Sequence, residues 1–196
     1  MLRWVVLFVC SLMLAGLAAC SPPPKPSVPN LIFSGGPQFV LPAEGEVEVV
    51  EQYETSAQLP EGHHEFGLKP AQIATAWARD RIKVDPGDGT VRMTILDASV
   101  AENELETEKG LAGLFKDQPD RQMTARLKVR LDYVGIAGSA TATVEAASER
   151  KFNESDSIRE TEAAYYDMIE RLAQTFQEKM DASVREHFAK LFASPA

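Results

Sequence analysis

Histidines and carboxylates mark the places where this sequence could hold a metal. Residues 63–65 (His-His-Glu) are the only cluster of this kind, and no second pair at i, i+4 completes a zinc or copper site. His187 lies far away in the sequence. Asp85 and Asp88 belong to a Gly-rich turn that lacks the oxygen-ligand spacing of a calcium loop. The sequence therefore predicts neither a metal nor a cofactor.

Nucleophiles for catalysis are equally scarce. The Gly-x-Ser-x-Gly and P-loop patterns are both missing, and the two cysteines, Cys10 and Cys20, lie within the first twenty residues. The 29 acidic residues permit a carboxylate pair in space, but no pattern defines a cleft that would hold one. We therefore expect a protein that is not an enzyme.

Two stretches are of more interest as contact surfaces. Leu111, Leu114 and Phe115 stand among glycines in a connection that is otherwise charged. They predict either a loop that folds back over a sheet edge or a docking loop for another protein. Arg126, Lys128 and Arg130 form a basic row on one face of a predicted strand. This row is consistent with either a solvated strand face or a binding site for phosphate or an acidic sugar.

The charge of the chain limits its partners. The formal net charge is −9 at pH 7. An acidic protein repels nucleic acid and anionic headgroups, so we expect no nucleic-acid partner and favour basic partners. The excess of acidic residues also has a simpler interpretation, namely that it maintains solubility.

Alternating apolar and polar residues predict about four strands. We expect them at 46–55, at 91–97, at 123–133 (the most regular) and at 140–146, with a hairpin turn at 135–138 between the last two. Pro70 begins a helix whose apolar side chains reach Ile82, and the region 102–120 reads as a long charged connection.

The last predicted element is a helix over 157–192. Ser157 and Glu160 form a capping-box pair, and apolar residues then recur at steps of three and four up to Phe188 and Leu191. An unbroken helix of this length would span about 54 Å, which is more than a four-stranded sheet requires. We expect the helix either to break or to project and offer Phe188 and Leu191 to a partner.

These elements predict an α+β fold. Two helices on one face of about four mainly antiparallel strands would bury both apolar helix faces and the inward row of the hairpin. The predicted architecture is therefore a two-layer sandwich, formed by residues 31–196 as a single domain.

The N-terminus resembles that of bacterial lipoproteins. Arg3 precedes an apolar core over residues 5–14, and Leu17-Ala18-Ala19-Cys20 matches the lipobox, which ends the signal peptide at residue 19. From Trp4 to Ala19 only sixteen residues are uncharged, fewer than a permanent span needs. The resemblance implies that Cys20 is lipidated, with three acyl chains, and becomes the first residue of the mature chain.

A Pro-rich tether over residues 20–30 follows the lipobox. Its nine residues from Ser21 to Pro29 form a semi-rigid spacer of roughly 28 Å. Removal of residues 1–19 leaves 177 of the 196 residues, with no cysteine other than Cys20 and hence no disulfide. Ser21 stands where many proteobacteria read an inner-membrane retention signal, usually Asp. The resemblance thus implies the periplasmic face of the outer membrane rather than the inner membrane.

The order of elements over residues 46–192 also resembles that of the lipopolysaccharide-assembly lipoprotein and of the auxiliary lipoproteins of ABC-type lipid transporters. No motif beyond the lipobox supports that likeness, so it transfers no functional residue. It implies a non-enzymatic accessory factor for cell-envelope assembly or lipid transport, with another envelope protein as partner. The alternative is a lipoprotein that binds a small or lipidic ligand between helices and sheet, since Ala140, Ala142 and Ala146 leave room there.

Overall fold

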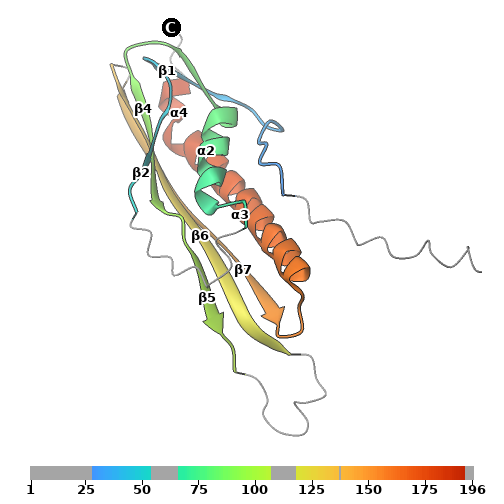
Figure 1. The fold of residues 1–196 in the computed structure, drawn as a ribbon. Coiled ribbons are helices and arrows are strands. Elements are labelled where there is room, and N and C mark those ends of the chain that lie inside the picture. The colour runs from blue at the N-terminus through green and yellow to red at the C-terminus, as the bar shows by residue number, and fades with distance from the viewer. Residues whose placement is uncertain (1–27, 54–65, 107–117, 137, 193–196) are drawn as a thin grey trace, which may run out of the picture.

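The fold is built around one curved, mostly antiparallel sheet, seen in a computed structural model that describes residues 28–53, 66–106, 118–136 and 138–192 (Figure 1). β6 and β7 form its centre and one side, β4 and β5 follow one another along the other side of β6, and β2 pairs with β4 in parallel. The strands are β2 (Glu48–Glu51), β4 (Thr90–Asp97), β5 (Val100–Glu104), β6 (Pro119–Gly135) and β7 (Gly138–Asn153).

The β6–β7 hairpin confirms the most regular of the predicted strands. Gly135 pairs with Gly138 at the turn, and pairing continues to Pro119 opposite Asn153. Both strands are longer than predicted. β7 continues past Ala146 through a charged stretch, and the prediction stopped there because this stretch has no apolar alternation. Along β6 the side chains alternate between buried and more exposed, which leaves one face of the sheet in the core.

Three short strands were not predicted. β5 lies within and just before the expected connection at 102–120, where it pairs with the start of β6. β1 (Phe39–Ala43) and β3 (Ile82–Pro86) form a separate parallel pair. Ile82, expected at the end of a helix, instead begins β3. In contrast, the strand expected at 46–55 is limited to the four residues of β2 within the described residues 46–53, and 54 and 55 lie outside them.

The helices begin where the sequence predicts. α2 (Pro70–Arg81) has its proline in the first turn, and α3 (Ile158–His187) opens with the Ser157–Glu160 capping box. The long helix breaks at Phe188, whose backbone leaves the helical region, and the short α4 (Ala189–Phe192) follows. No helix in the described ranges is long and apolar enough to cross a membrane.

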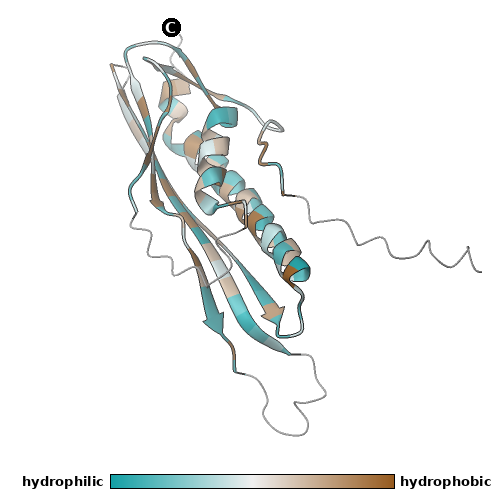
Figure 2. Cartoon of the chain, viewed as in Figure 1, coloured by the Kyte–Doolittle hydropathy of each residue, from teal (hydrophilic) through white to brown (hydrophobic). Residues whose placement is uncertain are grey.

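The core lies between these helices and the buried face of the main sheet. α3 packs on β7 and β6, and α2 packs on β6 and β4 (Figure 1). α3 carries apolar and polar residues on different sides, and Leu172, Phe176, Met180 and Val184 are fully buried on its inner side (Figure 2). The structure thus confirms a mixed α and β fold with a mostly antiparallel main sheet.

Tyr165 connects α3 to the segment that enters α2. Its hydroxyl donates a hydrogen bond to the carbonyl oxygen of Leu68 at 2.7 Å, and its ring lies 4.8 Å from the ring of Phe66. Because burial disfavours the charged phenolate, it raises the pKa of Tyr165 to about 12; the nearby Tyr166 contributes a smaller effect.

Tyr165→Phe should therefore reduce the loss of stability at alkaline pH. The folded-state pKa lies above the unfolded value of about 10, so the contribution of Tyr165 is complete below pH 10 and is lost as the pH rises towards 12. Between those limits the wild type should lose about 2–3 kcal/mol more than the variant. Urea unfolding at pH 8 and at several values up to pH 12 measures this difference. If the free energy of unfolding fell equally with pH in the wild type and in Tyr165→Phe, burial would not raise the pKa of Tyr165.

Candidate functional site

The structure places the predicted contact residues of the last helix inside the fold. Phe188 is 0% exposed and Leu191 is 7% exposed, and the rings of Phe188 and Phe192 stack with centroids 6.5 Å apart. The helix breaks instead of projecting, so Phe188 and Leu191 turn onto the core, and neither side chain is presented to a partner. Leu111, Leu114 and Phe115 lie outside the described residues, as does Cys20.

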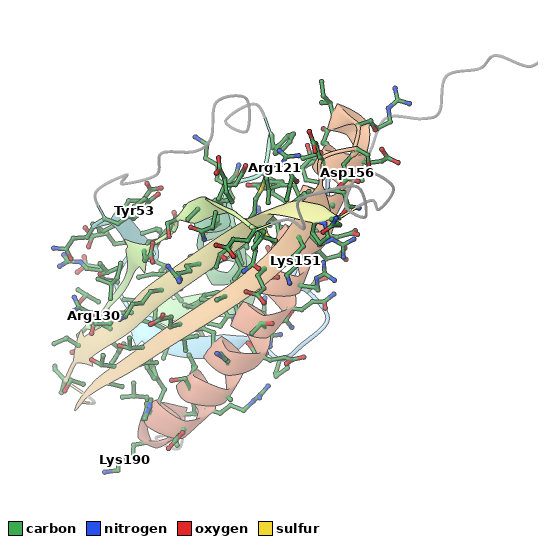
Figure 3. All side chains as sticks on the ribbon, turned by 90° about the horizontal axis from the view of Figure 1, so that it is seen from below. Tyr53, Arg121, Arg130, Lys151, Asp156 and Lys190 are labelled. Carbon is green, nitrogen blue, oxygen red and sulfur yellow. The ribbon has the colours of Figure 1, made fainter. Side chains whose placement is uncertain are left out.

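The predicted basic row lies on the face of the main sheet opposite the helices. Two of its three cations have acidic neighbours: Lys128 Nζ lies 3.5 Å from a Glu145 oxygen, and Arg130 Nε donates to Asp132 at 2.9 Å. Arg92 on β4 similarly donates to Glu48 on β2 at 2.7 Å. Figure 3 labels Arg130 on β6 and Lys151 on β7 among the side chains of these strands. Around Lys128 and Arg130 the face therefore carries paired charges of both signs, the pattern of a solvated strand face.

The two carboxylates of the Gly-rich turn have structural contacts. Asp88 accepts a hydrogen bond from the Ile136 amide at 2.6 Å, which joins this turn to the tip of the β6–β7 hairpin. Asp85 pairs with Lys83 at 2.9 Å. Residues 63–65 lie outside the described ranges, and within those ranges no three His, Cys, Asp or Glu side chains gather as a metal site would require.

A buried ion pair joins the two long helices. Arg81, at the end of α2, is 0% exposed, and its guanidinium contacts the carboxylate of Asp181 on α3 through both Nε (3.2 Å) and Nη2. Trp77 Nε1 also donates to Asp181, at 3.1 Å. Arg81 Nη1 has no hydrogen-bond partner in the described part of the chain. An unpaired buried charge is costly, so Arg81 on α2 and Asp181 on α3 each require the other as counter-charge.

Phe39 packs beside this ion pair and brings β1 to the helices. The guanidinium carbons of Arg81 and Arg185 lie 5.7 and 5.9 Å from the centroid of its ring. Its ring also lies 6.1 Å from that of Trp77 and 5.8 Å from that of Phe192. The cluster fixes the chain where it enters β1.

The segment before β1, residues 28–38, lies across α2 and α3, and we call it the strap. Figure 1 shows it in blue, running beside the helices towards β1. The Phe33 amide donates to Asp80 on α2 at 2.9 Å, and Phe33 is 5% exposed. Gly36 lies against the Arg81 guanidinium so closely that an added Cβ would be 2.1 Å from Nη1. The strap is thus held firmly from Phe33 onwards.

Before Phe33 the strap covers two hollows between itself and the helices. One, of about 680 Å³, lies on the α3 side, between residues 28–33 and side chains that include Tyr166, Asp167 and Ala173. The other, of about 370 Å³, lies on the α2 side, between residues 29–31 and side chains that include Leu68, Ala76 and Arg79. We call the two hollows together the α2–α3 groove. It does not lie between helices and sheet, where the predicted ligand cavity would be.

Asp80 is the polar anchor of the groove. The Arg79 side chain donates to it at 2.7 Å and, with the Phe33 amide, holds the pKa of the Asp80 carboxyl below its ordinary value against the opposing effect of burial. Arg79 Nη2 also reaches the Leu31 carbonyl oxygen at 3.4 Å. Adjacent residues of α2 therefore offer an acceptor and a donor to the backbone of an extended chain.

The sequence analysis did not identify the Arg81–Asp181 pair or the groove. One signal for the pair was available: Arg81 continues the apolar side of α2 four residues after Trp77, and Asp181 lies three residues before Val184 on that of α3. Two opposite charges on apolar helix faces indicate a buried pair. The groove has no comparable signal, since it depends on where the strap crosses the helices.

No protein-family model matches the chain, and no curated protein matches it. Similar solved structures include a Xanthomonas campestris protein described by the family model DUF330, at 14% identity over 82% of this chain and 94% of that one, with a TM-score of 0.37. Rare lipoprotein B from Shewanella oneidensis matches at 9% identity over 72% and 98%, with a TM-score of 0.34. A minor lipoprotein from Acinetobacter baumannii matches at 11% identity over 69% and 92%, with a TM-score of 0.33. Similarity this low does not assign the chain to a family.

Proposed function

We propose that this protein is a lipid-anchored bacterial envelope lipoprotein that faces the periplasm and acts as a non-enzymatic accessory factor in envelope assembly or lipid transport. The observation that carries the anchor is the position of Cys20, at the end of an apolar leader and directly before the Pro-rich tether. We place the protein at the outer membrane, because Ser21 stands where an inner-membrane signal would be read.

The geometry favours a protein partner on the face of the main sheet away from the helices. In the part of the chain that the structure describes, both long helices pack on the opposite face. The uncovered face combines exposed threonines, Thr141 and Thr143, with the ion pairs of β6 and β7. Paired charges of both signs suit a polar protein surface better than a polyanion or a uniformly anionic membrane.

Replacement of Cys20 tests the anchor. Cys20→Ala should abolish the incorporation of labelled fatty acid, because no acyl chain can be attached. Cys10→Ala is the matched control, since it removes the other cysteine and should leave the protein on the membrane. Fractionation and incorporation of labelled fatty acid measure both variants. A Cys20→Ala protein that still incorporates labelled fatty acid would contradict lipidation of Cys20.

Site-specific cross-linking in cells tests the interaction. A photo-reactive residue at Thr143, on the uncovered face, should give a defined adduct with one envelope protein. The same residue at Glu178, which is exposed on α3, serves as the control and should not give this adduct. Recovery of the monomer alone from both positions would contradict the accessory role. If that monomer retained extractable lipid, the ligand-binding alternative would replace it.

A further inference from the structure

We infer that the outer side of the strap is a membrane-contact surface, through which Val28 and Ile32 contact the phospholipid bilayer that holds the lipid of Cys20. The inference rests on the proposed function for the lipid on Cys20. It adds which side of the domain lies towards the bilayer, and it names phospholipid as the partner of that side.

The strap has an inner and an outer side. From residue 28 to residue 33 the exposure of the side chains alternates, so that odd-numbered residues are half-buried or buried and even-numbered residues are exposed. Val28 is 53% exposed and Ile32 is 56% exposed. The bond from the Phe33 amide to Asp80, at 2.9 Å, fixes the strap directly after Ile32. Two apolar side chains are therefore presented outwards by a segment that is itself held in place.

The lipid anchor lies close to these side chains along the chain. Positions 20 and 28 are eight residues apart, so even a fully extended connection between Cys20 and Val28 reaches at most about 29 Å. A surface attached over so short a distance meets the bilayer at an effective concentration in the millimolar range. Burial of Val28 and Ile32 then needs to contribute little to favour contact, because the anchor already supplies the proximity.

The charges beside the strap favour contact on its α2 side. Arg79 lines the smaller hollow beside the strap, and Lys69 is exposed at the N-cap of the same helix. The only carboxylate on α2 is that of Asp80, which accepts from Arg79 at 2.7 Å. On the α3 side, by contrast, the exposed Asp167 and Glu170 line the larger hollow. The α2 side is therefore the one suited to lipid phosphates, although the chain as a whole is acidic.

This orientation leaves the uncovered face of the main sheet available to a protein partner. The helices lie between the sheet and the start of the strap (Figure 1). With the strap towards the bilayer, the uncovered face points away from it. The bilayer and the partner would thus contact opposite sides of the domain.

The test places one environment-sensitive fluorophore on the lipidated protein in phosphatidylcholine vesicles. Once Cys20 carries lipid, an introduced cysteine is the only free thiol of the mature chain. A label at Ile32→Cys should lose at least half of its fluorescence when the vesicles contain nitroxide-labelled lipid, because this quencher acts only at short range. Ile136→Cys is the matched control, since Ile136 is also an isoleucine, is 90% exposed and lies at the β6–β7 turn of the sheet. Its label should keep its fluorescence.

A second pair of variants tests whether apolar contact holds the strap to the lipid. A label at Val28→Cys should also be quenched at least twofold. Adding Ile32→Ser to that protein should reduce the quenching at least twofold, because the contact loses its larger apolar side chain. Val28→Cys also serves as the labelling position if Ile32→Cys does not fold.

Incorporation of labelled fatty acid separates failure of the anchor from failure of the orientation. A protein that carries no fatty acid lacks the anchor, which overturns both the proposed function and this inference. A protein that carries fatty acid but shows equal quenching on the strap and at Ile136→Cys, or no quenching at either position, overturns the inference alone. Contact of the strap with a protein instead of lipid would give this second result, since the vesicles contain no other protein.

Discussion

Asp181→Ala should destabilise the protein by about 3–5 kcal/mol. The substitution leaves the guanidinium of Arg81, which is 0% exposed, without its counter-charge, and it removes the acceptor of Trp77 Nε1. The cost comes mainly from the buried cation that remains, since its hydration is not recovered in the folded state. Urea unfolding followed by Trp77 fluorescence and by circular dichroism measures the loss.

Two further variants separate this cause from a general effect of mutation. Arg185 lies 3.7 Å from Asp181, but its side chain is 54% exposed, so Arg185→Ala should cost less than about 1 kcal/mol. The double variant Arg81→Met, Asp181→Leu removes both charges and should recover much of the stability lost in Asp181→Ala. An Asp181→Ala protein that unfolds at the wild-type urea concentration would contradict the role of the pair.

Gly89→Ala should have the second largest effect, a loss of about 1–3 kcal/mol. An added Cβ would lie 2.5 Å from the Tyr133 ring and 2.6 Å from the Pro42 carbonyl oxygen. These groups cannot easily move, because the Tyr133 hydroxyl donates to that same oxygen at 2.9 Å and the ring is fully buried. Since Gly89 joins β1 to the turn before β4, the clash should separate β1 from the main sheet.

Gly35→Ala is the matched control for the Gly89 substitution. It adds the same methyl group at a position with open space around it. Its free energy of unfolding should therefore stay within a few tenths of a kcal/mol of the wild-type value. Equal midpoints for Gly89→Ala and Gly35→Ala would mean that the contact between Gly89 and Tyr133 adapts without cost.

Local patterns predicted the elements that have one polar and one apolar side. The alternation in β6 and the capping box of α3 each specify an element without reference to the rest of the chain, and both are confirmed. β5 and the second half of β7 lack such a pattern, because their side chains are largely exposed and their position is set by backbone pairing with β6. Their existence therefore depends on a neighbouring strand that the local sequence does not reveal.

The candidate site was less predictable than the fold for the same reason. The apolar pattern continues to residue 192, so the sequence allows either a break or a projecting end that carries Phe188 and Leu191. The structure has the break at Phe188, after which Phe192 stacks on Phe39. The groove is made by residues more than a hundred positions apart, such as Leu31 and Tyr166. Hydrophobic periodicity describes the faces of elements and does not specify which distant segment crosses them.

The crossing of the strap over α3 also has a consequence for the order of folding. The strap precedes every helix and strand of the domain in sequence, yet one side of its groove belongs to α3, near the end of the chain. The β6–β7 hairpin and α3 are neighbours in sequence and can associate early. The strap instead closes a loop of 47 residues to reach Asp80 on α2 and a longer one to reach α3. We therefore expect the strap to dock last, so that during every round of synthesis the groove stands open for a short time while the strap is still free.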